Sequence, residues 1–376
     1  MPSLRVVIVG GGIGGLSAAL ALRSAGAEVR VYEQAAELGE VGAGVGLYPN
    51  SMRLLQRLGV ADSITRRAAP VNEWWMFAPD GSVLSHQVAG RDGQISSLGM
   101  YRPDLVAALA AGLPRGVLHT GHRCVAFSQD DRSAVVTFDN GESVEADVVV
   151  AADGIHSTLQ RYVVEPRRPV FSGAVAYRGV MPAARVPDWS WPQALVSWAG
   201  QGKHFLVFPV RAGTLLNYVG FVPADEQMRE SWSAPGDPAV LAAEFADWDP
   251  RLSRLLSQVD ATLRWGLYDR DPLPRWTHGR LTLLGDAAHP MLPHMGQGAN
   301  QAIEDGMALA TLMRDTDAGD VTDVLIRYQA LRHDHTARVQ QGSRANGMRM
   351  DSGQAINIGQ PGVQDYDVEA EARAIR

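Results

Sequence analysis

The amino-acid sequence predicts an α/β fold, in which a Rossmann-like nucleotide-binding domain is interrupted by a sheet-rich domain and closed by C-terminal helices. The first observation is the opening order of elements: a strand, a Gly-rich turn, a helix and a second strand. The second is a change in the sequence pattern over residues 168–270, where strand-like runs dominate. The third is a pair of helical patterns over residues 299–313 and 321–349. Alternating strands and helices are typical of a parallel sheet covered by helices.

The pattern of each segment in the first domain supports this prediction. Residues 4–9 form a continuous β-branched run, which is typical of a buried parallel strand. Residues 16–25 are small and apolar, as a helix packed closely on a sheet requires, and residues 28–33 form a second strand. Later elements are predicted as helices over 49–58 and 105–113, strands over 147–152 and 281–284, and a hairpin of residues 133–138 and 143–146 around Asp139-Asn140-Gly141.

The sheet-rich region is predicted to be a separate substrate domain. Antiparallel strands are expected over residues 71–100, and strand-like runs follow at 170–180, 195–198, 204–210, 214–222 and 262–267. The predicted division gives residues 1–70, 98–168 and 271–350 to the nucleotide-binding domain, and residues 71–97 and 169–270 to the substrate domain. Residues 351–376 are polar and weakly patterned, so a poorly ordered tail is expected. The helix that carries Arg332, Arg338 and Arg344 is expected to present a solvated basic face.

Composition excludes several classes of protein. The 376 residues are 46% hydrophobic and 20% charged, which rules out bulk disorder. The net charge of −7 argues against a nucleic-acid-binding protein. The single Cys124 excludes a disulfide scaffold, and no group of His, Asp and Glu has metal-ligand spacing. No apolar run approaches about 18 residues, and the first one enters a Gly-rich turn. Neither a membrane span nor a signal peptide is therefore expected, and the predicted compartment is the cytoplasm.

A Gly-rich turn follows the first strand and opens the first helix. Gly10, Gly12 and Gly15 have the Gly-x-Gly-x-x-Gly spacing, which lets backbone N–H groups approach a pyrophosphate at a helix N-terminus. Glu33 ends the next strand, 18 residues after Gly15, and suits the two hydroxyls of an adenosine ribose. The alternative is a tight turn with a surface Glu. Together these features predict a dinucleotide site without distinguishing NAD from FAD.

Two further strands end in Gly and Asp residues. Asp153-Gly154 follows the strand over 147–152, and Gly285-Asp286 follows the strand over 281–284. A carboxylate at a strand end can bind a sugar or ribityl hydroxyl, and a Gly-rich helix start can face a pyrophosphate or a flavin ring. Each is also compatible with a plain turn, but their order and separation favour a flavin dinucleotide. The helix start after the second strand contains Gly296, Gly298 and Asn300.

In these segments the chain resembles the single-component, FAD-dependent aromatic hydroxylases, which include salicylate, 3-hydroxybenzoate and 6-hydroxynicotinate monooxygenases. The resemblance covers about residues 4–345. It implies a tightly and non-covalently bound FAD, with Glu33 on the adenosine ribose, Arg102 on the flavin nucleotide and Asp286 on the pyrophosphate–ribityl region. In this family Asp153-Gly154 is associated with both FAD and the nicotinamide nucleotide. The sequence has no second dinucleotide fingerprint, which fits NADH or NADPH that binds transiently.

The chemistry of that family makes physical demands on the substrate domain. Reduced flavin reacts with O2 to form a C4a-hydroperoxide, an electrophile that attacks an electron-rich ring. A phenolate is far more electron-rich than a phenol, so a base near the ring hydroxyl is expected. The site must also be dry, because the hydroperoxide otherwise decays to hydrogen peroxide. We therefore expect a titratable residue within an apolar lining.

His204 is the first candidate for this base. It lies in a predicted strand, where His204, Leu206 and Phe208 alternate and so share one face. An imidazole ordinarily has a pKa of about 6.5, which suits removal of a phenolic proton near neutral pH. The resemblance agrees, since 3-hydroxybenzoate and 6-hydroxynicotinate enzymes carry a His at this place. The alternative is a strand-surface His paired to a neighbour.

His294 is the second candidate, in a loop expected beside the flavin ring. Pro293-His294-Met295 with the following Gln-Gly resembles the 6-hydroxynicotinate branch, and Pro293 is expected to contact the substrate. The alternative is a loop His bonded to the backbone. Two positions depart from that branch, which has a His where this chain has Gly46 and a Tyr where it has Phe208.

Arg178 is a candidate to contact the flavin or to anchor a substrate carboxylate. Tyr177-Arg178-Gly179 resembles the start of the sheet-rich region in the salicylate group, and the alternative is an interdomain salt bridge.

The predicted function is hydroxylation of a salicylate-like hydroxybenzoate with NADH or NADPH and O2, by a monomer or homodimer. The alternatives are 3-hydroxybenzoate 6-hydroxylase or 6-hydroxynicotinate 3-monooxygenase activity, a flavin oxidase or dehydrogenase, and a non-catalytic flavin-binding module.

Overall fold

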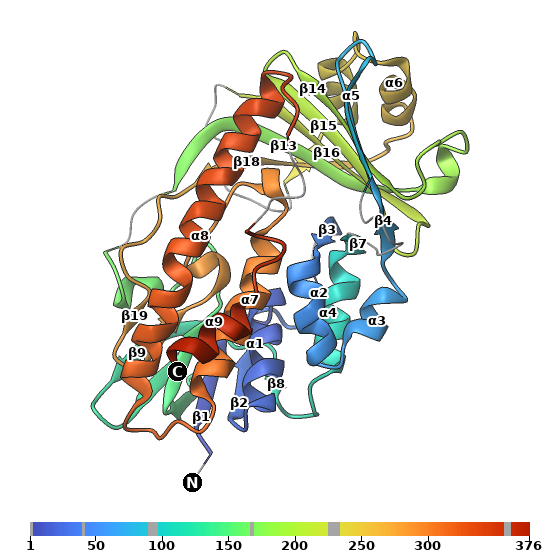
Figure 1. Cartoon of the computed structure of the whole chain (residues 1–376). Coiled ribbons are helices and arrows are strands. Elements are labelled where there is room, and N and C mark those ends of the chain that lie inside the picture. The colour runs from blue at the N-terminus through green and yellow to red at the C-terminus, as the bar shows by residue number, and fades with distance from the viewer. Residues whose placement is uncertain (1–2, 40–41, 89–96, 166–168, 225–233, 357–361) are drawn as a thin grey trace.

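The computed structural model describes residues 3–39, 42–88, 97–165, 169–224, 234–356 and 362–376. Two sheets lie at opposite ends of the molecule, and the long helix α8 (Val321–Asp351) runs from one to the other (Figure 1). Both termini lie at the end that holds the smaller of these two sheets. The arrangement confirms the predicted α/β class, with a sheet-rich region and closing helices.

The first sheet contains the parallel strands predicted from the β-branched runs. β1 (Arg5–Val9) lies between β2 (Glu28–Tyr32) and β12 (Val148–Ala151), and β12 pairs in parallel with β20 (Leu281–Leu283). β1, β12 and β20 are almost completely buried, as their continuous apolar runs require, whereas Glu28 and Arg30 of β2 are exposed. The outer strands are β8 (Leu118–His119) and β19 (Thr277–His278). The main core also contains α1 (Ile13–Ser24), α7 (Gly298–Met313) and the antiparallel strands β9 (Cys124–Gln129), β10 (Ala134–Phe138) and β11 (Ser143–Ala146).

The strand order of the first sheet brings distant segments together. β20, β12, β1 and β2 are consecutive neighbours in the sheet and run in the same direction. Because the carboxyl ends of parallel strands meet at one edge, the segments after β1, β12 and β20 converge there. The Gly-rich turn, Asp153 and Asp286 therefore belong to one edge, although they are far apart in the sequence.

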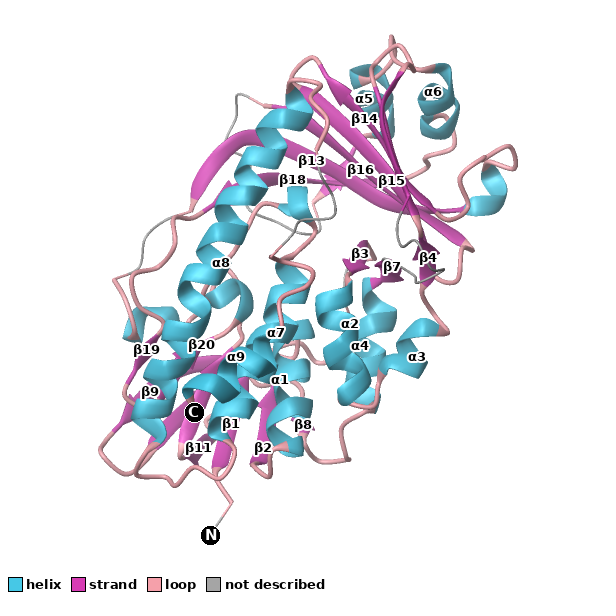
Figure 2. Ribbon diagram, in the orientation of Figure 1, coloured by secondary structure: helices cyan, strands magenta, loops and turns pink. Residues whose placement is uncertain are grey.

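The large sheet lies at the other end of the molecule (Figure 2). Its strands, in spatial order, are β17 (Pro235–Gly236), β18 (Thr262–Asp269), β13 (Val170–Pro182), β16 (Leu215–Pro223), β15 (Lys203–Val210), β14 (Ala194–Gly200), β5 (Glu73–Phe77) and β6 (Val83–Val88). One face packs against α5 (Pro238–Glu244) and α6 (Pro250–Leu256) and forms a separate apolar core. The alternate residues of the same strands face the first domain.

A small sheet and its helices lie between the two large units. β3 (Gly44–Leu47) and β4 (Ala69–Val71) pair with opposite sides of β7 (Ser97–Tyr101). The helices beside them are α2 (Pro49–Arg57), α3 (Ala61–Thr65) and α4 (Arg102–Ala111). Residues 89–96, within the stretch predicted as antiparallel strands, lie outside the described residues. The exact division of the chain into two domains stays a prediction.

The structure corrects the expectation of a poorly ordered tail. α9 (Val368–Ile375) packs against α7, and Val368 and Ala372 are buried in the main core. Asp367 caps this helix by accepting a hydrogen bond from the Ala370 N–H, and Glu369 forms an ion pair with Arg57. The two-turn apolar pattern was too short to predict the helix from sequence. Across the described ranges, no helix is long and apolar enough to cross a membrane.

A second correction concerns Arg332, which was expected on a solvated face. The Arg332 side chain is completely buried, and it donates hydrogen bonds to Asp305 and Glu304 of α7, each at 2.8 Å. Asp305 also accepts a hydrogen bond from the Gly285 N–H at 3.0 Å and lies 2.6 Å from Nε2 of His289. Burial alone would raise the pKa of Asp305, but His289 and Arg332 hold it at about 2. This ion cluster therefore ties α8 to α7 and to the turn after β20.

We predict that Arg332→Met lowers the free energy of unfolding by about 3–5 kcal/mol, because two buried carboxylates then lose their counter-charge. The measurement is urea denaturation at neutral pH. Arg338→Met on the exposed face of the same helix is the matched control and should change stability little. Equal stability of the two variants would show that the buried cluster makes no net contribution.

Candidate active site

A cavity of about 610 Å3 lies between the carboxyl edge of the first sheet and the inner face of the large sheet. It extends from the Gly-rich turn after β1 to the middle of β15, so one continuous space joins the two predicted parts of the site. The predicted nucleotide-binding residues that line it are Gly10, Gly12, Glu33, Arg102, Asp153, Gly154, Gly285, Asp286, Gly296 and Gly298. The predicted catalytic and substrate residues that line it are His204, His294, Arg178, Leu206, Phe208 and Pro293.

The Gly-rich turn is packed too tightly for side chains on its protein side. Gly10 has φ +111°, and a Cβ there would lie 2.2 Å from the Ala152 carbonyl oxygen. A Cβ on Gly15 would lie 1.9 Å from the Gly10 carbonyl oxygen, so Gly15 serves helix packing and does not line the cavity. A Cβ on Gly12 would meet no described atom within 4 Å. Gly10 and Gly15 thus allow the close backbone packing of the turn, and Gly12 leaves space on the side of the cavity.

The carboxylates of Glu33 and Asp153 accept backbone hydrogen bonds at the ends of β2 and β12. Glu33 accepts hydrogen bonds from the N–H groups of Gly11 at 2.7 Å and Ala35 at 2.8 Å, so it fixes the turn as well as facing the cavity. Asp153 accepts a hydrogen bond from the Thr158 N–H through Oδ2 at 2.8 Å. Burial raises the pKa of the Asp153 carboxyl, and its buried Oδ1 has no hydrogen-bond partner in the described part of the chain. Asp153 therefore lines the cavity with one carboxylate oxygen that has no partner among the described residues.

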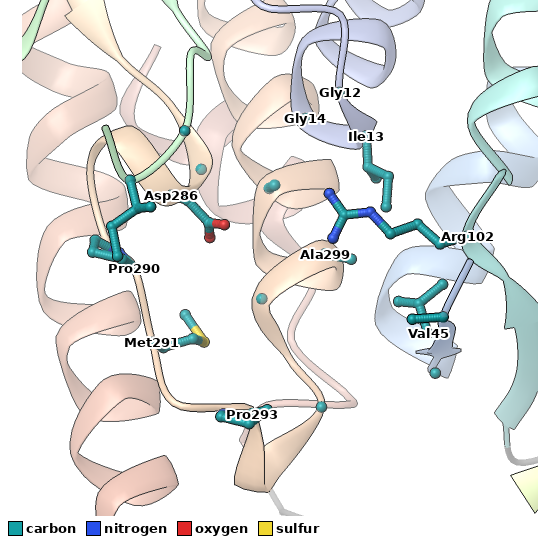
Figure 3. A pocket seen from close by; sticks show the side chains of 18 of the residues that line it. Gly12, Ile13, Gly14, Val45, Arg102, Asp286, Pro290, Met291, Pro293 and Ala299 are labelled. Atoms are coloured by element: carbon teal, nitrogen blue, oxygen red, sulfur yellow. The ribbon is translucent and has the colours of Figure 1, made fainter. Parts of the chain in front are cut away.

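Opposite charges face the cavity around the start of α7. Figure 3 shows the Asp286 carboxylate and the Arg102 guanidinium pointing toward the same space from opposite sides of Ala299. Asp286 is exposed, whereas Asn300, in the first turn of α7, is completely buried. The Asn300 side chain accepts a hydrogen bond from the Tyr48 N–H and donates to the carbonyl oxygens of Gly46 and Gly296. Asn300 therefore braces the loops and is not among the residues that line the cavity, and its role as a cofactor contact stays a prediction.

His204 lies on the inner face of β15 together with Leu206 and Phe208. Its imidazole is 1% exposed and stacks on Phe221 with ring centroids 4.3 Å apart. Nδ1 lies 2.8 Å from Oδ1 of Asp351, the last residue of α8. Nε2 is buried and has no hydrogen-bond partner among the described residues. The imidazole is thus paired on one side and available on the other.

His294 lies beside His204, with ring centroids 5.1 Å apart. Burial and the neighbouring imidazole of His204 lower the pKa of His294 to about 3. Gly347 of α8 makes room for this ring, because a Cβ there would lie 2.7 Å from Cδ2 of His294. His294 is therefore neutral near pH 7 and is a far weaker base than an ordinary imidazole.

Arg178 and Asn217 place polar groups on the same inner face. The Arg178 guanidinium lies 3.9 Å from the centroid of the Trp265 ring, over which it stacks, and the residue is 6% exposed. Asn217 accepts a hydrogen bond from the Gly44 N–H at 2.7 Å, and its buried Nδ2 has no partner within the described ranges. Sequence reasoning missed Asn217, although its alternation with Val219 and Phe221 on β16 would have placed it on this face. Asp351 was also missed, because no local pattern links it to His204.

The two ends of the cavity suit different chemistry. The end near the Gly-rich turn offers backbone N–H groups, carboxylates and Arg102, which are suited to phosphates and sugar hydroxyls. The end at the large sheet is mainly apolar, with a free imidazole nitrogen and a guanidinium, and it suits a small aromatic anion. Among the residues with described positions, no group of three or more His, Cys, Asp and Glu side chains is arranged to hold a metal ion.

Comparisons with known proteins agree with this geometry. The family described as FAD binding domain matches residues 3–343. A 3-amino-4-hydroxybenzoate 2-monooxygenase of Streptomyces platensis is 38% identical over 349 residues, covering 91% of this chain and 87% of the relative. A salicylate hydroxylase of Pseudomonas putida is 36% identical over 373 residues, covering 92% and 85%. A 6-hydroxynicotinate 3-monooxygenase of Bordetella bronchiseptica is 33% identical over 350 residues, covering 91% of each chain.

Solved structures share the fold over nearly the whole chain. A salicylate hydroxylase in a substrate complex superimposes with a TM-score of 0.84 at 28% identity, covering 99% of this chain and 97% of the other. The Klebsiella pneumoniae protein HpxO, in complex with FAD and uric acid, superimposes with a TM-score of 0.80 at 27% identity, covering 92% and 88%.

We predict that His294→Gln makes folding stability less dependent on pH. Between about pH 6.5 and the folded-state pKa of about 3, the unfolded chain binds a proton on His294 that the folded chain does not. Stability from this group is therefore present above pH 6.5 and is lost as the pH falls. From pH 7 to pH 5 the wild type should lose about 2 kcal/mol more than the variant in urea denaturation.

The exposed His278 supplies the control for this measurement. His278→Gln should keep the pH dependence of the wild type. If His294→Gln loses stability as steeply as the wild type, the folded protein protonates His294 near its ordinary pKa.

Proposed function

The chain belongs to the family of FAD-dependent aromatic-ring monooxygenases, and we propose that it hydroxylates a salicylate-like hydroxybenzoate with NADH or NADPH as reductant and O2 as oxygen donor. The observation that carries this proposal is the buried Nε2 of His204, which has no hydrogen-bond partner among the described residues, on a side chain that lines the same apolar space as Arg178. These are the groups required by a ring that bears a hydroxyl and a carboxylate.

The residues at the nucleotide end of the cavity fit FAD. The buried Oδ1 of Asp153 would accept a hydrogen bond from a ligand hydroxyl, and Asp286 and Arg102 would bind the ribityl and phosphate region. When bound, FAD supplies the two-electron chemistry that activates O2. Non-covalent binding is supported by Cys124, which lines the cavity, because burial raises the pKa of its thiol to about 12 and keeps it protonated.

His204 activates the ring by removing a proton. Nε2 accepts the proton of the ring hydroxyl, and the resulting phenolate is more electron-rich than the phenol. Arg178 holds the carboxylate by a charge-assisted hydrogen bond, and its stacking on Trp265 limits its motion. Leu206, Phe208 and Phe221 exclude water from the ring. His294 stays neutral and so does not compete for the proton.

The substrates named for the relatives share an aromatic ring, a carboxylate and a ring hydroxyl. They are 3-amino-4-hydroxybenzoate, salicylate and 6-hydroxynicotinate. A hydroxybenzoate is favoured here over a hydroxypyridine, because Phe208 presents an apolar ring and Gly46 carries no side chain. The protein is further proposed to act in the cytoplasm as a monomer or homodimer, in keeping with its single, buried and free cysteine.

We predict that Asp286→Ala weakens FAD binding while leaving the fold intact. The carboxylate is exposed to the cavity, so its loss removes ligand hydrogen bonds worth about 1.5–3 kcal/mol. FAD titration of the apoprotein measures this change, after denaturation of the wild type has shown that the released chromophore has the mass of FAD. Asp188→Ala, which removes a carboxylate 78% exposed outside the cavity, should bind FAD as the wild type does. An unchanged dissociation constant for Asp286→Ala would remove this residue from the site.

We predict that His204→Ala still binds FAD and oxidises NADH or NADPH but loses hydroxylation by ~10²–10⁴-fold, because the ring is no longer deprotonated. The reducing equivalents should then appear as hydrogen peroxide. Raising the pH toward about 10, where a free phenol ionises, should partly restore the product. The experiment measures product mass per nicotinamide oxidised across hydroxybenzoates, aminohydroxybenzoates and hydroxypyridines.

Two outcomes contradict the proposed function or the role of His204. Oxidation of a substrate without a gain of one oxygen atom in the wild type would indicate an oxidase or dehydrogenase. If His204→Ala stays coupled while His294→Gln loses coupling and recovers at high pH, the base is His294.

A further inference from the structure

We infer that Asp351, the last residue of α8, is a positioning residue that fixes the proton of His204 on Nδ1 and so keeps Nε2 as the acceptor for the substrate proton. This inference rests on the proposed role of His204 as the base. It assigns a role to the end of the long helix α8, which in Figure 1 lies at the large sheet, far from the edge of the first sheet.

The hydrogen-bonding chemistry of the pair determines which ring nitrogen carries the proton. Nδ1 of His204 lies 2.8 Å from Oδ1 of Asp351. An ionised carboxylate only accepts hydrogen bonds, and a neutral imidazole has one donor nitrogen and one acceptor nitrogen. The short contact therefore places the hydrogen on Nδ1. The lone pair is left on Nε2, which is buried and finds no other partner in the described part of the chain.

Asp351 is held in place independently of its side chain. Its carbonyl oxygen accepts a hydrogen bond from the Gly202 N–H at 2.9 Å, in the turn between β14 and β15. The preceding Met350 and the following Ile356 pack with Met76 and Ala199 in a small apolar cluster. Substitution of the carboxylate therefore leaves the end of α8 docked on the same hairpin that carries His204.

Other charged and titratable groups around His204 do not replace Asp351. His294 faces the imidazole from the loop after β20, but it is neutral near pH 7 because burial lowers its pKa to about 3. Phe221 of β16 stacks on the ring and carries no charge. Lys203, the preceding residue, is paired with Glu244. Arg178 lines the same cavity from β13 and is a cation.

The pairing also links the two ends of the site through one helix. Arg332, in the middle of α8, is bonded to Asp305, which accepts a hydrogen bond from Gly285 in the nucleotide-binding turn. Asp351, at the end of the same helix, contacts the base. α8 thus sets the position of the imidazole relative to the nucleotide edge.

The test compares Asp351→Asn, Asp351→Glu and the control Ser352→Ala, which changes an exposed neighbour. In the FAD-loaded enzyme, Asp351→Asn should lower product formation by up to about 10²-fold, because the acceptor nitrogen is no longer fixed. FAD affinity and the KM for substrate should change little. The product-against-pH profile should also change, because a neutral amide replaces the carboxylate beside Nδ1. Asp351→Glu should recover part of the activity, and Ser352→Ala should match the wild type.

A readout that needs no turnover separates this inference from the proposed function. In FAD-loaded protein labelled with ¹⁵N-histidine, the His204 signals are assigned by their loss in His204→Gln. The wild type should show Nδ1 protonated and Nε2 unprotonated, and Asp351→Asn should lose this preference. A wild-type imidazole protonated on Nε2, or unchanged signals and an unchanged pH profile in Asp351→Asn, would overturn the inference. Normal imidazole signals in a wild type that hydroxylates no compound of the panel would instead overturn the proposed function alone.

Discussion

The buried charge of Arg332 is the constraint on which the arrangement of the site depends. A guanidinium removed from water requires counter-charges, and Glu304 and Asp305 of α7 supply them within 2.8 Å. Asp305 uses its other oxygen to hold the Gly285 N–H and His289. One ion cluster therefore sets the turn after β20, the start of the helix that borders the cavity, and the long helix that reaches the large sheet. The same contacts therefore join the edge of the first sheet to the helix whose end contacts His204, the residue proposed as the base.

Alternation along the strands of the large sheet separates its core from the cavity. Phe205, Val207 and Tyr218 pack with α5 and α6, whereas their neighbours His204 and Leu206 face the other side. The apolar core between the sheet and helices α5 and α6 stabilises the strands. The opposite face of the sheet can therefore carry buried polar groups. The cavity wall can thus be dry and still present an imidazole and a guanidinium.

The two histidines at this wall have different roles because their surroundings differ. His294 has a neighbouring imidazole and little solvent, so its pKa falls to about 3 and it stays neutral. His204 has a carboxylate beside Nδ1, which orients the ring and leaves the second nitrogen free for a ligand. Two identical side chains with ring centroids 5.1 Å apart therefore differ: His294 is a neutral neighbour, and His204 is the candidate base.

The sequence by itself determined the features that local geometry dictates. Strand, turn and helix patterns located Gly10, Asp153 and Asp286, and parallel strand order then required them to share one edge. The period of two along a strand placed His204, Leu206 and Phe208 on one face. The roles assigned to these residues stay predictions.

Only the tertiary structure decided which distant groups meet. The partners of Arg332, the contact between Asp351 and His204, and the use of Asn300 as a brace all join segments without a local sequence signal. The sequence of α8 did not predict that Arg332 is buried. A buried Arg and an exposed Arg give the same local pattern, and only the position of Glu304 and Asp305 on α7 distinguishes them. Local periodicity fixes which way a side chain faces, but long-range packing decides what it faces.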